Sequence, residues 1–394
     1  MIEKRQPVWV LIFTISLGAT CAVLIAPALT EIRDYFHVSS GQSQQLVAIF
    51  LLGYAISQLI SGPISNSIGR KNILFFGFLL GIVAVLLSIL AIFLKNFEIL
   101  YLLRGIMGLG VGTGVSISMA IVNETFEESK ARKVMAVCVA SFALAPGIGS
   151  CIGGLISQYL GFLFCFVFLC ILTLFNLLIT TKLVETLPIS MRVKFSIKQT
   201  FMSYYLAFRN KKIIASALVY GLPVACMYLI VALVPFIAIQ NLGISPSVCG
   251  ILILVSYMGY FLGSFIPGIL NVKFKPLTVV YIGTLYLALI SLGLLVLEIG
   301  NMISVFSLFS LIFLFFLGTP LIYVNISVYG ISNHFDKATA SSVLMFIVAF
   351  LSFLSLHIGG TFHDGFECVL TFGCFLASIL TLLIFVIFIK KENS

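Results

Sequence analysis

Charged side chains are scarce in this 394-residue chain, and almost none lies within a hydrophobic stretch. Only 9% of the residues are Asp, Glu, Lys or Arg, whereas 61% are hydrophobic. A soluble domain carries roughly 25% charged residues, so this chain lacks the polar surface that a soluble body of its size requires. The composition excludes a soluble protein and indicates an integral membrane protein.

Patterns of catalytic and metal-binding residues are also missing. The sequence contains no HExxH or GxSxG motif, and no pair of acids occurs within a hydrophobic stretch. Its nine cysteines show no CxxC or Cys/His spacing, so we interpret them as buried apolar residues. The connections between hydrophobic stretches are mostly too short for a soluble domain. We therefore expect neither an enzyme nor a metal or cofactor site.

Hydrophobic runs recur along the whole chain and set its fold class. Each run is about 20 residues long, which lets one helix cross a hydrocarbon core of about 30 Å. The runs lack the alternation of a membrane β-barrel, so helices are the expected spanning element. We predict an all-α polytopic protein with twelve transmembrane helices, at 8–29, 45–65, 72–94, 99–122, 134–156, 162–184, 213–240, 247–270, 277–297, 303–327, 339–361 and 367–389.

Basic residues distinguish the two sides of the predicted bundle. If the N-terminus is cytoplasmic, only Arg33 and Lys95 fall on the far side. This positive-inside imbalance predicts that both termini are cytoplasmic, and it explains the net charge of +9 without a nucleic-acid partner. The cytoplasmic basic residues would be Lys4, Arg5, Arg70, Lys71, Lys130, Arg132, Lys133, Lys182, Arg192, Lys194, Lys198, Arg209, Lys211, Lys212, Lys273, Lys275, Lys337, Lys390 and Lys391.

One long connection separates the first six predicted spans from the last six. It interleaves aromatic residues such as Phe201 and Tyr205 with basic ones, which fits an amphipathic helix on the inner leaflet. Similar segments at 54–63 and 259–268, each followed by cations, suggest two related halves around a central cavity, a transporter plan. We therefore divide the chain into an N-terminal six-helix half (1–184), a cytoplasmic basic linker (185–212) and a C-terminal six-helix half (213–394).

Arg104 is the only charged residue placed well inside a predicted span, and no acid lies between Ile99 and Val122. A guanidinium keeps its proton, and on insertion scales it costs at least about 2.5 kcal/mol at the membrane centre. Arg104 must therefore face a partner, a cavity or water. We expect it to line the central cavity, with a structural role in capping freed backbone carbonyls as the alternative.

The second span is followed by the sequence Gly62-Pro63-Ile64-Ser65-Asn66-Ser67-Ile68-Gly69-Arg70-Lys71. We expect Gly62 and Pro63 to end the helix and Gly69 to turn the chain sharply. The segment resembles the signature loop of the major facilitator superfamily, Gly-x-x-x-Asp-x-x-Gly-Arg-Arg/Lys. Asn66 stands where that family usually has Asp, so the expected charged gate contact becomes a hydrogen bond.

The fourth and fifth spans extend this resemblance. Arg104 followed by Gly108 is similar to the superfamily's Arg-x-x-x-Gly pattern, and the segment 143–154 resembles the Gly/Pro-rich motif of drug/proton antiporters. With 26–29 and 58–63, these motifs most resemble the bicyclomycin-resistance (Bcr/CflA) group of multidrug exporters. That group usually carries an acid within the first span, but the region around Val23 has none. The resemblance therefore does not identify the coupling residue.

The resemblance implies a secondary transporter of the bacterial inner membrane that exports drugs or other small molecules in exchange for protons, by alternating access. We expect it to act as a monomer in the lipid bilayer, with a small-molecule substrate and the proton gradient as driving force. Arg104, which has no acidic partner in its span, favours an alternative. In that alternative the chain carries a specific anionic metabolite, such as a carboxylate siderophore or an organic acid, in either direction.

The candidate site residues fall into three groups. For substrate binding we select Arg104, Tyr54, Gln58, Tyr228, Tyr257 and Asn325, with Tyr220 and Asn123 as further neutral candidates. For proton coupling we consider His357, the one histidine within a span, and the acids Glu31 and Asp34 just past the first span. Glu124 is either a gate partner of Arg70 or a bystander. The gating or conformational candidates are Gly62, Asn66, Gly69, Arg70, Lys71, Glu124, Pro146, Gly147 and Gly149.

Overall fold

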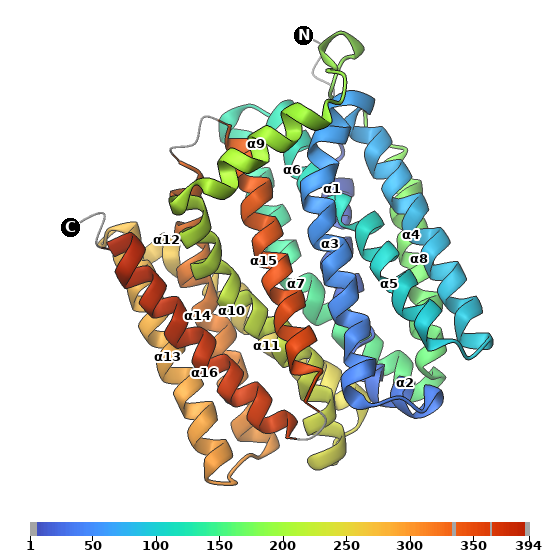
Figure 1. The fold of residues 1–394 in the computed structure, drawn as a ribbon, viewed down its shortest axis with the longest axis vertical. Helices are drawn as coiled ribbons and strands as arrows, with labels where there is room; N and C mark the ends of the chain where they lie inside the picture. Colours follow the sequence, from blue (N-terminus) through green and yellow to red (C-terminus); the bar gives the residue numbers. More distant parts are fainter. Residues whose placement is uncertain (1–5, 333–335, 363–364, 391–394) are drawn as a thin grey trace.

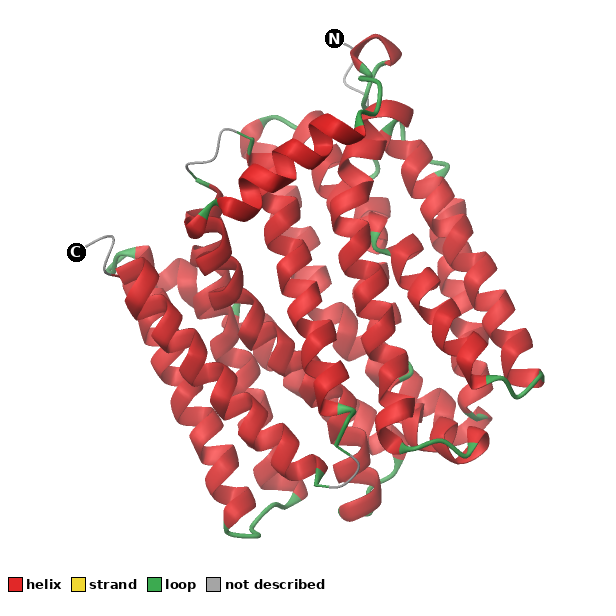
Figure 2. Cartoon of the chain, in the orientation of Figure 1, coloured by secondary structure: helices red, strands yellow, loops and turns green. Residues whose placement is uncertain are grey.

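The computed structural model describes residues 6–332, 336–362 and 365–390, and they are almost entirely helical (Figure 2). Lys4, Arg5 and Lys391, which entered the charge argument, lie outside the described residues. Twelve helical stretches in this part of the chain are long and apolar enough to cross a membrane. The predicted all-α fold with twelve spanning helices is confirmed.

Several of the spans are built from more than one helical segment. The first comprises α1, the 3₁₀ turn η1 and α2, the fourth comprises α5 and α6, and π-helical turns η3 and η4 extend α10 and α16. The segments are α1 (Val8–Val23), η1 (Ala26–Ala28), α2 (Leu29–Phe36), α3 (Ser40–Ile68), α4 (Arg70–Phe93), α5 (Phe97–Val111), α6 (Thr113–Thr125), α7 (Glu128–Leu160), α8 (Phe162–Thr180), η2 (Ile189–Met191), α9 (Ile197–Arg209), α10 (Lys211–Pro235), η3 (Phe236–Asn241), α11 (Pro246–Gly263), α12 (Ile266–Leu270), α13 (Pro276–Ile299), α14 (Val305–Ile331), α15 (Lys337–Gly359), α16 (Phe366–Ile384) and η4 (Phe385–Lys390).

The expectation that Gly62 and Pro63 end the second span is wrong. Helix α3 continues through Pro63 to Ile68, and no neighbouring atom approaches Gly62. A proline inside a helix removes the hydrogen bond to the carbonyl four residues earlier, which here belongs to Leu59. The hydroxyl of Tyr204 on α9 donates a hydrogen bond to that carbonyl. The linker helix thus satisfies the group that Pro63 frees, and the chain turns only at Gly69, where φ is +106°.

The first six spans and the last six form two sets that lie side by side (Figure 1). Two helix pairs make most of the contact between them, because α7 packs on α11 and α15 packs on α3. Helix α9 runs across the end of the bundle at which α1 starts and η4 ends. We call this end the basic face, because Arg70, Lys130 and Lys211 lie in the first turns of helices there, and we call the other end the opposite face.

The two sets are pressed together near the opposite face. A Cβ atom on Gly41 of α3 would lie 2.0 Å from the carbonyl oxygen of Gly360, and one on Gly154 of α7 would lie 2.4 Å from the carbonyl oxygen of Pro246. The side-chain amide of Gln44 donates across the same seam to the carbonyl of Leu356, at 3.2 Å. Only glycine permits backbones to approach this closely, so the opposite face is closed.

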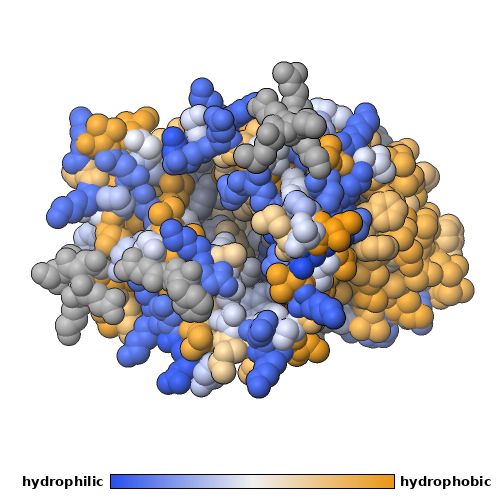
Figure 3. Space-filling view, turned by 90° about the horizontal axis from the view of Figure 1, so that it is seen from above, coloured by the Kyte–Doolittle hydropathy of each residue, from blue (hydrophilic) through white to orange (hydrophobic). Residues whose placement is uncertain are grey.

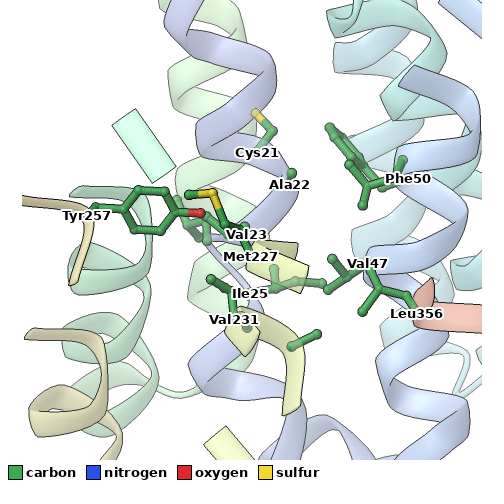
Figure 4. Packing of buried hydrophobic residues seen from close by; sticks show 14 of the residues in the cluster. Cys21, Ala22, Val23, Ile25, Val47, Phe50, Met227, Val231, Tyr257 and Leu356 are labelled. Atoms are coloured by element: carbon green, nitrogen blue, oxygen red, sulfur yellow. The ribbon is translucent and has the colours of Figure 1, made fainter. Parts of the chain in front are cut away.

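A layer of apolar side chains lies on the interior side of these glycine contacts. Val23, Ile25 and Val47 of the first set belong to the same buried cluster as residues of the second set, including Met227 and Leu356 (Figure 4). Aliphatic side chains from both sets are thus buried together between the cavity and the opposite face. The interior is therefore sealed from the opposite face by two successive contacts.

The basic face is open between the two sets. Seen toward this face, hydrophilic side chains surround a hollow middle, and apolar side chains cover the flank (Figure 3). The linker helix α9 packs on α15 here, where its Ala207 is buried with Ala340 and Val343. Together with the bond from Tyr204 to α3, this contact places α9 between the basic ends of α3 and α15.

Candidate functional site: a central transport cavity

A cavity of about 250 Å³ lies between the two sets of spans. Helices α3, α6 and α7 form its first wall, and α10, α11, α14 and α15 form its second. The lining of the first wall is Leu51, Tyr54, Gln58, Val115, Met119, Val139, Phe142, Ala143 and Pro146. The lining of the second is Tyr220, Val224, Met227, Tyr228, Tyr257, Tyr260, Tyr323, Ser327, Met345, Val348, Ala349 and Ser352.

The lining carries no charged side chain, and tyrosine is its most frequent residue. Hydroxyl groups are distributed unequally between the walls. The first wall contributes one tyrosine and Gln58, whose amide donates to the carbonyl of Gly112 at 3.1 Å. The second wall contributes five tyrosines and two serines. The cavity can therefore hold an uncharged molecule with one apolar side and one hydrogen-bonding side.

Three tyrosines of the second wall are stacked. The ring centroids of Tyr220 and Tyr323 are 5.5 Å apart with an interplanar angle of 25°, and those of Tyr260 and Tyr323 are 5.7 Å apart at 16°. Tyr257 meets Phe316 edge-on, with centroids 4.9 Å apart. Stacked and edge-on pairs are the favourable arrangements of aromatic rings, so this wall is firmly packed.

Most of the neutral binding candidates from the sequence do line the cavity: Tyr54, Gln58, Tyr220, Tyr228 and Tyr257. Asn325 and Asn123 do not. The side chain of Asn325 is paired with that of Asn271, with Nδ2 of Asn271 2.8 Å from Oδ1 of Asn325, whereas Asn123 is exposed near the end of α6.

Sequence reasoning missed Tyr260, Tyr323 and Phe142 in the lining. The spacing of Tyr257 and Tyr260, three residues apart, places both on one helical face and could have indicated the first of them. For the other two, the surrounding helix is apolar on all sides, and no periodicity marks the inward face.

Arg104 lies outside the lining of the cavity and is completely buried. Its Nη2 donates to the carbonyl of Cys21 at 3.1 Å and its Nε to the carbonyl of Leu46 at 3.4 Å. The guanidinium also lies over the ring of Phe50, 4.6 Å from its centroid, and contacts the sulfur of Met107. This arrangement is that of the capping alternative.

The carbonyl of Cys21 belongs to the last turn of α1, which ends at Val23. Carbonyls of a last turn have no intrahelical donor, and together they form the negative end of the helix dipole. Arg104 therefore finds its counter-charge in a helix end. In the described part of the chain no carboxylate pairs with it.

The three coupling candidates all lie toward the opposite face, outside the cavity lining. Glu31 accepts a hydrogen bond from the hydroxyl of Ser157 on α7, at 3.0 Å. Asp34 is exposed and pairs with Arg33 at 2.5 Å. Nδ1 of His357 lies 2.9 Å from Oε1 of Gln45, in the seam between α15 and α3. Among the three, only Glu31 links two helices of the first set through a partly buried hydrogen bond.

The basic-face motif forms a connected network. Arg70 pairs with Glu124 at 2.8 Å, and its Nη1 donates to Oδ1 of Asn66 at 2.7 Å. The carboxylate of Glu185 accepts from the backbone N–H groups of Arg70 and Lys71, at 2.9 and 3.2 Å. The Arg70–Glu124 pairing considered from the sequence is present, and Asn66 makes the expected hydrogen bond. The network ties α3, α4 and α6 to the start of the linker.

The remaining gating candidates lie along α7. Pro146 lines the cavity, and a Cβ on Gly147 would lie 2.7 Å from the Cβ of Tyr257. Gly149 lies against Thr20 of α1 in the same way, at 2.9 Å. These glycines let α7 pack closely on both α1 and α11, so α7 is one of the two helices of the first set that contact the second most extensively.

Known proteins resemble this chain in sequence and in fold. An uncharacterized transporter of Rickettsia bellii is 28% identical over 87% of this chain and 86% of its own length. The chloramphenicol resistance protein CraA of Acinetobacter baumannii is 26% identical over 62% of the chain and 58% of its own length. The bicyclomycin resistance protein homolog of Haemophilus influenzae is 30% identical, but over only 38% of each chain.

A solved structure of a D-xylose-proton symporter matches with a TM-score of 0.74 at 15% identity, covering 95% of this chain and 96% of its own, which shows a shared fold. The sequence model of the Major Facilitator Superfamily matches residues 8–309. The protein is therefore a multi-pass membrane transporter of small molecules and not an enzyme. The chain belongs to the major facilitator superfamily.

Proposed function

We propose that the protein is a proton-coupled exporter of uncharged organic molecules that works by alternating access. The observation that carries this proposal is the central cavity, which is aromatic, uncharged in its lining and closed toward the opposite face. Transfer of a charged group into such a cavity is costly because no counter-charge replaces its water, whereas an apolar molecule gains from burial. Drug-resistance proteins among the relatives support the same class of cargo.

The drug-resistance proteins among the relatives support export as the direction of transport, and the orientation in the membrane is supported by the basic face. Its surplus of Lys and Arg is the signature of a cytoplasmic surface, so we infer that the cavity is loaded from the cytoplasm of a bacterial cell. Bacterial relatives support an inner-membrane location. The anionic-metabolite alternative depended on a cation facing the substrate, and Arg104 is instead bonded to backbone carbonyls. No observation favours that alternative.

For proton coupling we propose Glu31. Its carboxylate joins the first span to α7 through Ser157, and α7 also packs on α11 of the second set. A carboxylate at such a contact loses its hydroxyl donor when the two helices move apart, and a bound proton can take the place of that donor. Exchange of a proton at Glu31 is thus tied to the motion of α7 during the transport cycle.

Inside-out membrane vesicles test the proposal directly. We expect wild-type vesicles to accumulate chloramphenicol when their lumen is made acidic, and to lose that uptake when a protonophore collapses the gradient. Ala349→Trp fills part of the cavity and should abolish uptake, whereas Leu289→Trp, at a position 67% exposed on α13, should not. Glu31→Gln should abolish gradient-driven uptake but retain binding. Uptake by the Ala349→Trp variant equal to wild type would refute a central pathway.

A further inference from the structure

The tyrosine stack of the second wall brings together three helices at one point. Tyr220 comes from α10, Tyr260 from α11 and Tyr323 from α14, and both outer rings are stacked on Tyr323. Tyr323 is therefore the middle ring. The three rings are nearly parallel and come from separate helices. A further ring that stacks on them would lie parallel to the same plane.

The two ends of the stack differ in accessibility. Tyr260 also lines the cavity, but it is only 7% exposed. Tyr220 is partly exposed and lines the cavity. Tyr220 is thus the more accessible end of the stack, and it is the end at which a flat ring inside the cavity can best continue it.

Hydroxyl groups near this open end lack partners. Within the described ranges of the chain, the hydroxyls of Tyr54, Tyr220 and Tyr228 make no hydrogen bond to another residue, while the side chains of Tyr260 and Tyr323 are bonded to each other. Tyr54 of the first wall is close enough to Tyr220 and Tyr228 for electrostatic interaction. Hydroxyl donors from both walls therefore line the same cavity, and a bound molecule with acceptor groups can satisfy them.

We propose that the cavity selects uncharged compounds that combine a flat aromatic ring with hydrogen-bond acceptors. The ring stacks on Tyr220 as a fourth member of the series, and the acceptors meet the hydroxyls of Tyr54 and Tyr228. This inference rests on the proposed export function and names its substrate class. The inference also distinguishes aromatic from saturated molecules of the same size. An apolar lining alone would accept both, but a saturated molecule cannot stack on a ring.

Two antibiotics make a matched pair for this selection. Chloramphenicol is uncharged and carries a nitrophenyl ring with carbonyl and nitro acceptors. Bicyclomycin is also uncharged and rich in oxygen, but it has no aromatic ring. The inference expects wild-type inside-out vesicles to transport chloramphenicol faster than bicyclomycin at equal concentration, although the sequence motifs resemble those of bicyclomycin-resistance proteins.

Removing the middle ring tests the cause of the preference. Tyr323→Leu should lower chloramphenicol transport about three- to tenfold, as expected for lost aromatic stacking, and lower bicyclomycin transport by a smaller factor. Tyr323→Phe keeps the ring and should keep most of the preference. Tyr159→Leu removes a tyrosine that is 72% exposed and lies outside the cavity lining, and it should behave as wild type. Tyr220→Leu is the second variant, and it should lower the preference even if Tyr323→Leu does not assemble.

The outcomes separate the inference from the proposed function. If wild-type vesicles transport both antibiotics equally, or if Tyr323→Leu and Tyr220→Leu lower both by the same factor, export stands and aromatic selection is refuted. If wild-type vesicles accumulate neither compound under an imposed gradient, the export proposal fails, and the inference fails with it. A selective loss of chloramphenicol transport in the leucine variants supports both.

Discussion

The two six-helix sets hold their helices together with different side-chain interactions. In the first, Arg70 at the start of α4 pairs with Glu124 near the end of α6. Toward the same face of the second, the uncharged Asn271, just after α12, pairs with Asn325 of α14. A charged pair is weakened by salt and by exposure to water, whereas an amide pair carries no net charge and is less sensitive to both.

A second position shows the same contrast. Gly53 of α3 lies against the carbonyl of Gly105, and Gly259 of α11 lies against the carbonyl of Phe313. The residue that precedes Gly105 is Arg104, and the residue that precedes Phe313 is Ile312. Arg104 and Ile312 therefore occupy corresponding positions in the two sets. Both are buried, but only the arginine needs polar partners. The first set thus holds its shape with charges, and the second provides most of the hydroxyl and aromatic wall of the cavity.

Replacing Arg104 with Ile makes the first set match the second at this point and has the largest expected effect. The carbonyl of Cys21 loses its donor, and an unsatisfied buried carbonyl costs about 1–3 kcal/mol. We expect a lower thermal unfolding temperature and an equal loss of transport for every substrate. Differential scanning fluorimetry of purified protein and vesicle uptake would measure both.

Arg104→Lys serves as the control for this substitution, because it keeps the charge and loses the planar fork, and it should lie between wild type and Arg104→Ile. Normal thermal stability combined with a loss of transport for anionic dyes alone would contradict the capping role. It would instead return Arg104 to substrate binding.

Neutralising the charged tie has an intermediate expected effect. The side chains of Arg70 and Glu124 are 12% and 30% exposed, so screening by water limits the pair to about 1 kcal/mol. Glu124→Gln should change the transport rate severalfold because it weakens the network between α4 and α6, and added salt should reduce the difference from wild type. Asn325→Ala, in the uncharged counterpart, should show no such dependence on salt. Equal salt responses in the two variants would remove the contrast between the sets.

Tyr204→Phe has the smallest expected effect and tests the tie between the linker and the first set. The variant loses the donor for the carbonyl of Leu59, which costs about 1 kcal/mol. Limited proteolysis of the linker should become faster, while transport changes by less than about threefold. Cleavage at the wild-type rate would show that the hydroxyl contributes nothing to docking of α9.

The same tie predicts a dependence on pH. Burial raises the pKa of Tyr204 to about 12, above its unfolded value of about 10. Folding therefore favours the protonated phenol, and this contribution is complete below about pH 10 and is lost as the pH rises toward 12. Wild-type linker should become more sensitive to proteolysis across that range, and the Tyr204→Phe linker should not show this step.

The sequence predicted the parts of this molecule that depend on local composition. Twelve spans follow from runs of apolar residues. The hydrogen bond between Arg70 and Asn66 follows from a motif whose members are only four residues apart. The end of α3 was mispredicted at Pro63, because the partner that lets the helix continue is Tyr204, which lies more than a hundred residues away. Local sequence carries no signal for such a partner.

The candidate site was only partly predictable for a related reason. Arg104 had no visible acidic partner because its partners are backbone carbonyls, which every residue possesses and no motif marks. Tyr260 and Tyr323 were missed because their helices are apolar on the lipid side as well as on the inner side, so hydrophobic periodicity does not distinguish the two. Tyr260 lies one helical turn from Tyr257, which was selected. That spacing was the only sequence feature that could have indicated Tyr260 as a lining residue.

The contact between Gly41 and Gly360 has a consequence for the balance between the conformations of the carrier. Its two backbones meet only while the opposite face is closed, so a methyl group at Gly41 raises the free energy of that state and leaves a state open at this face unaffected. Each 1.4 kcal/mol of such strain shifts the ratio of the two populations about tenfold. A hydrogen atom in place of a side chain at one position therefore helps to determine which way the unloaded protein faces at rest.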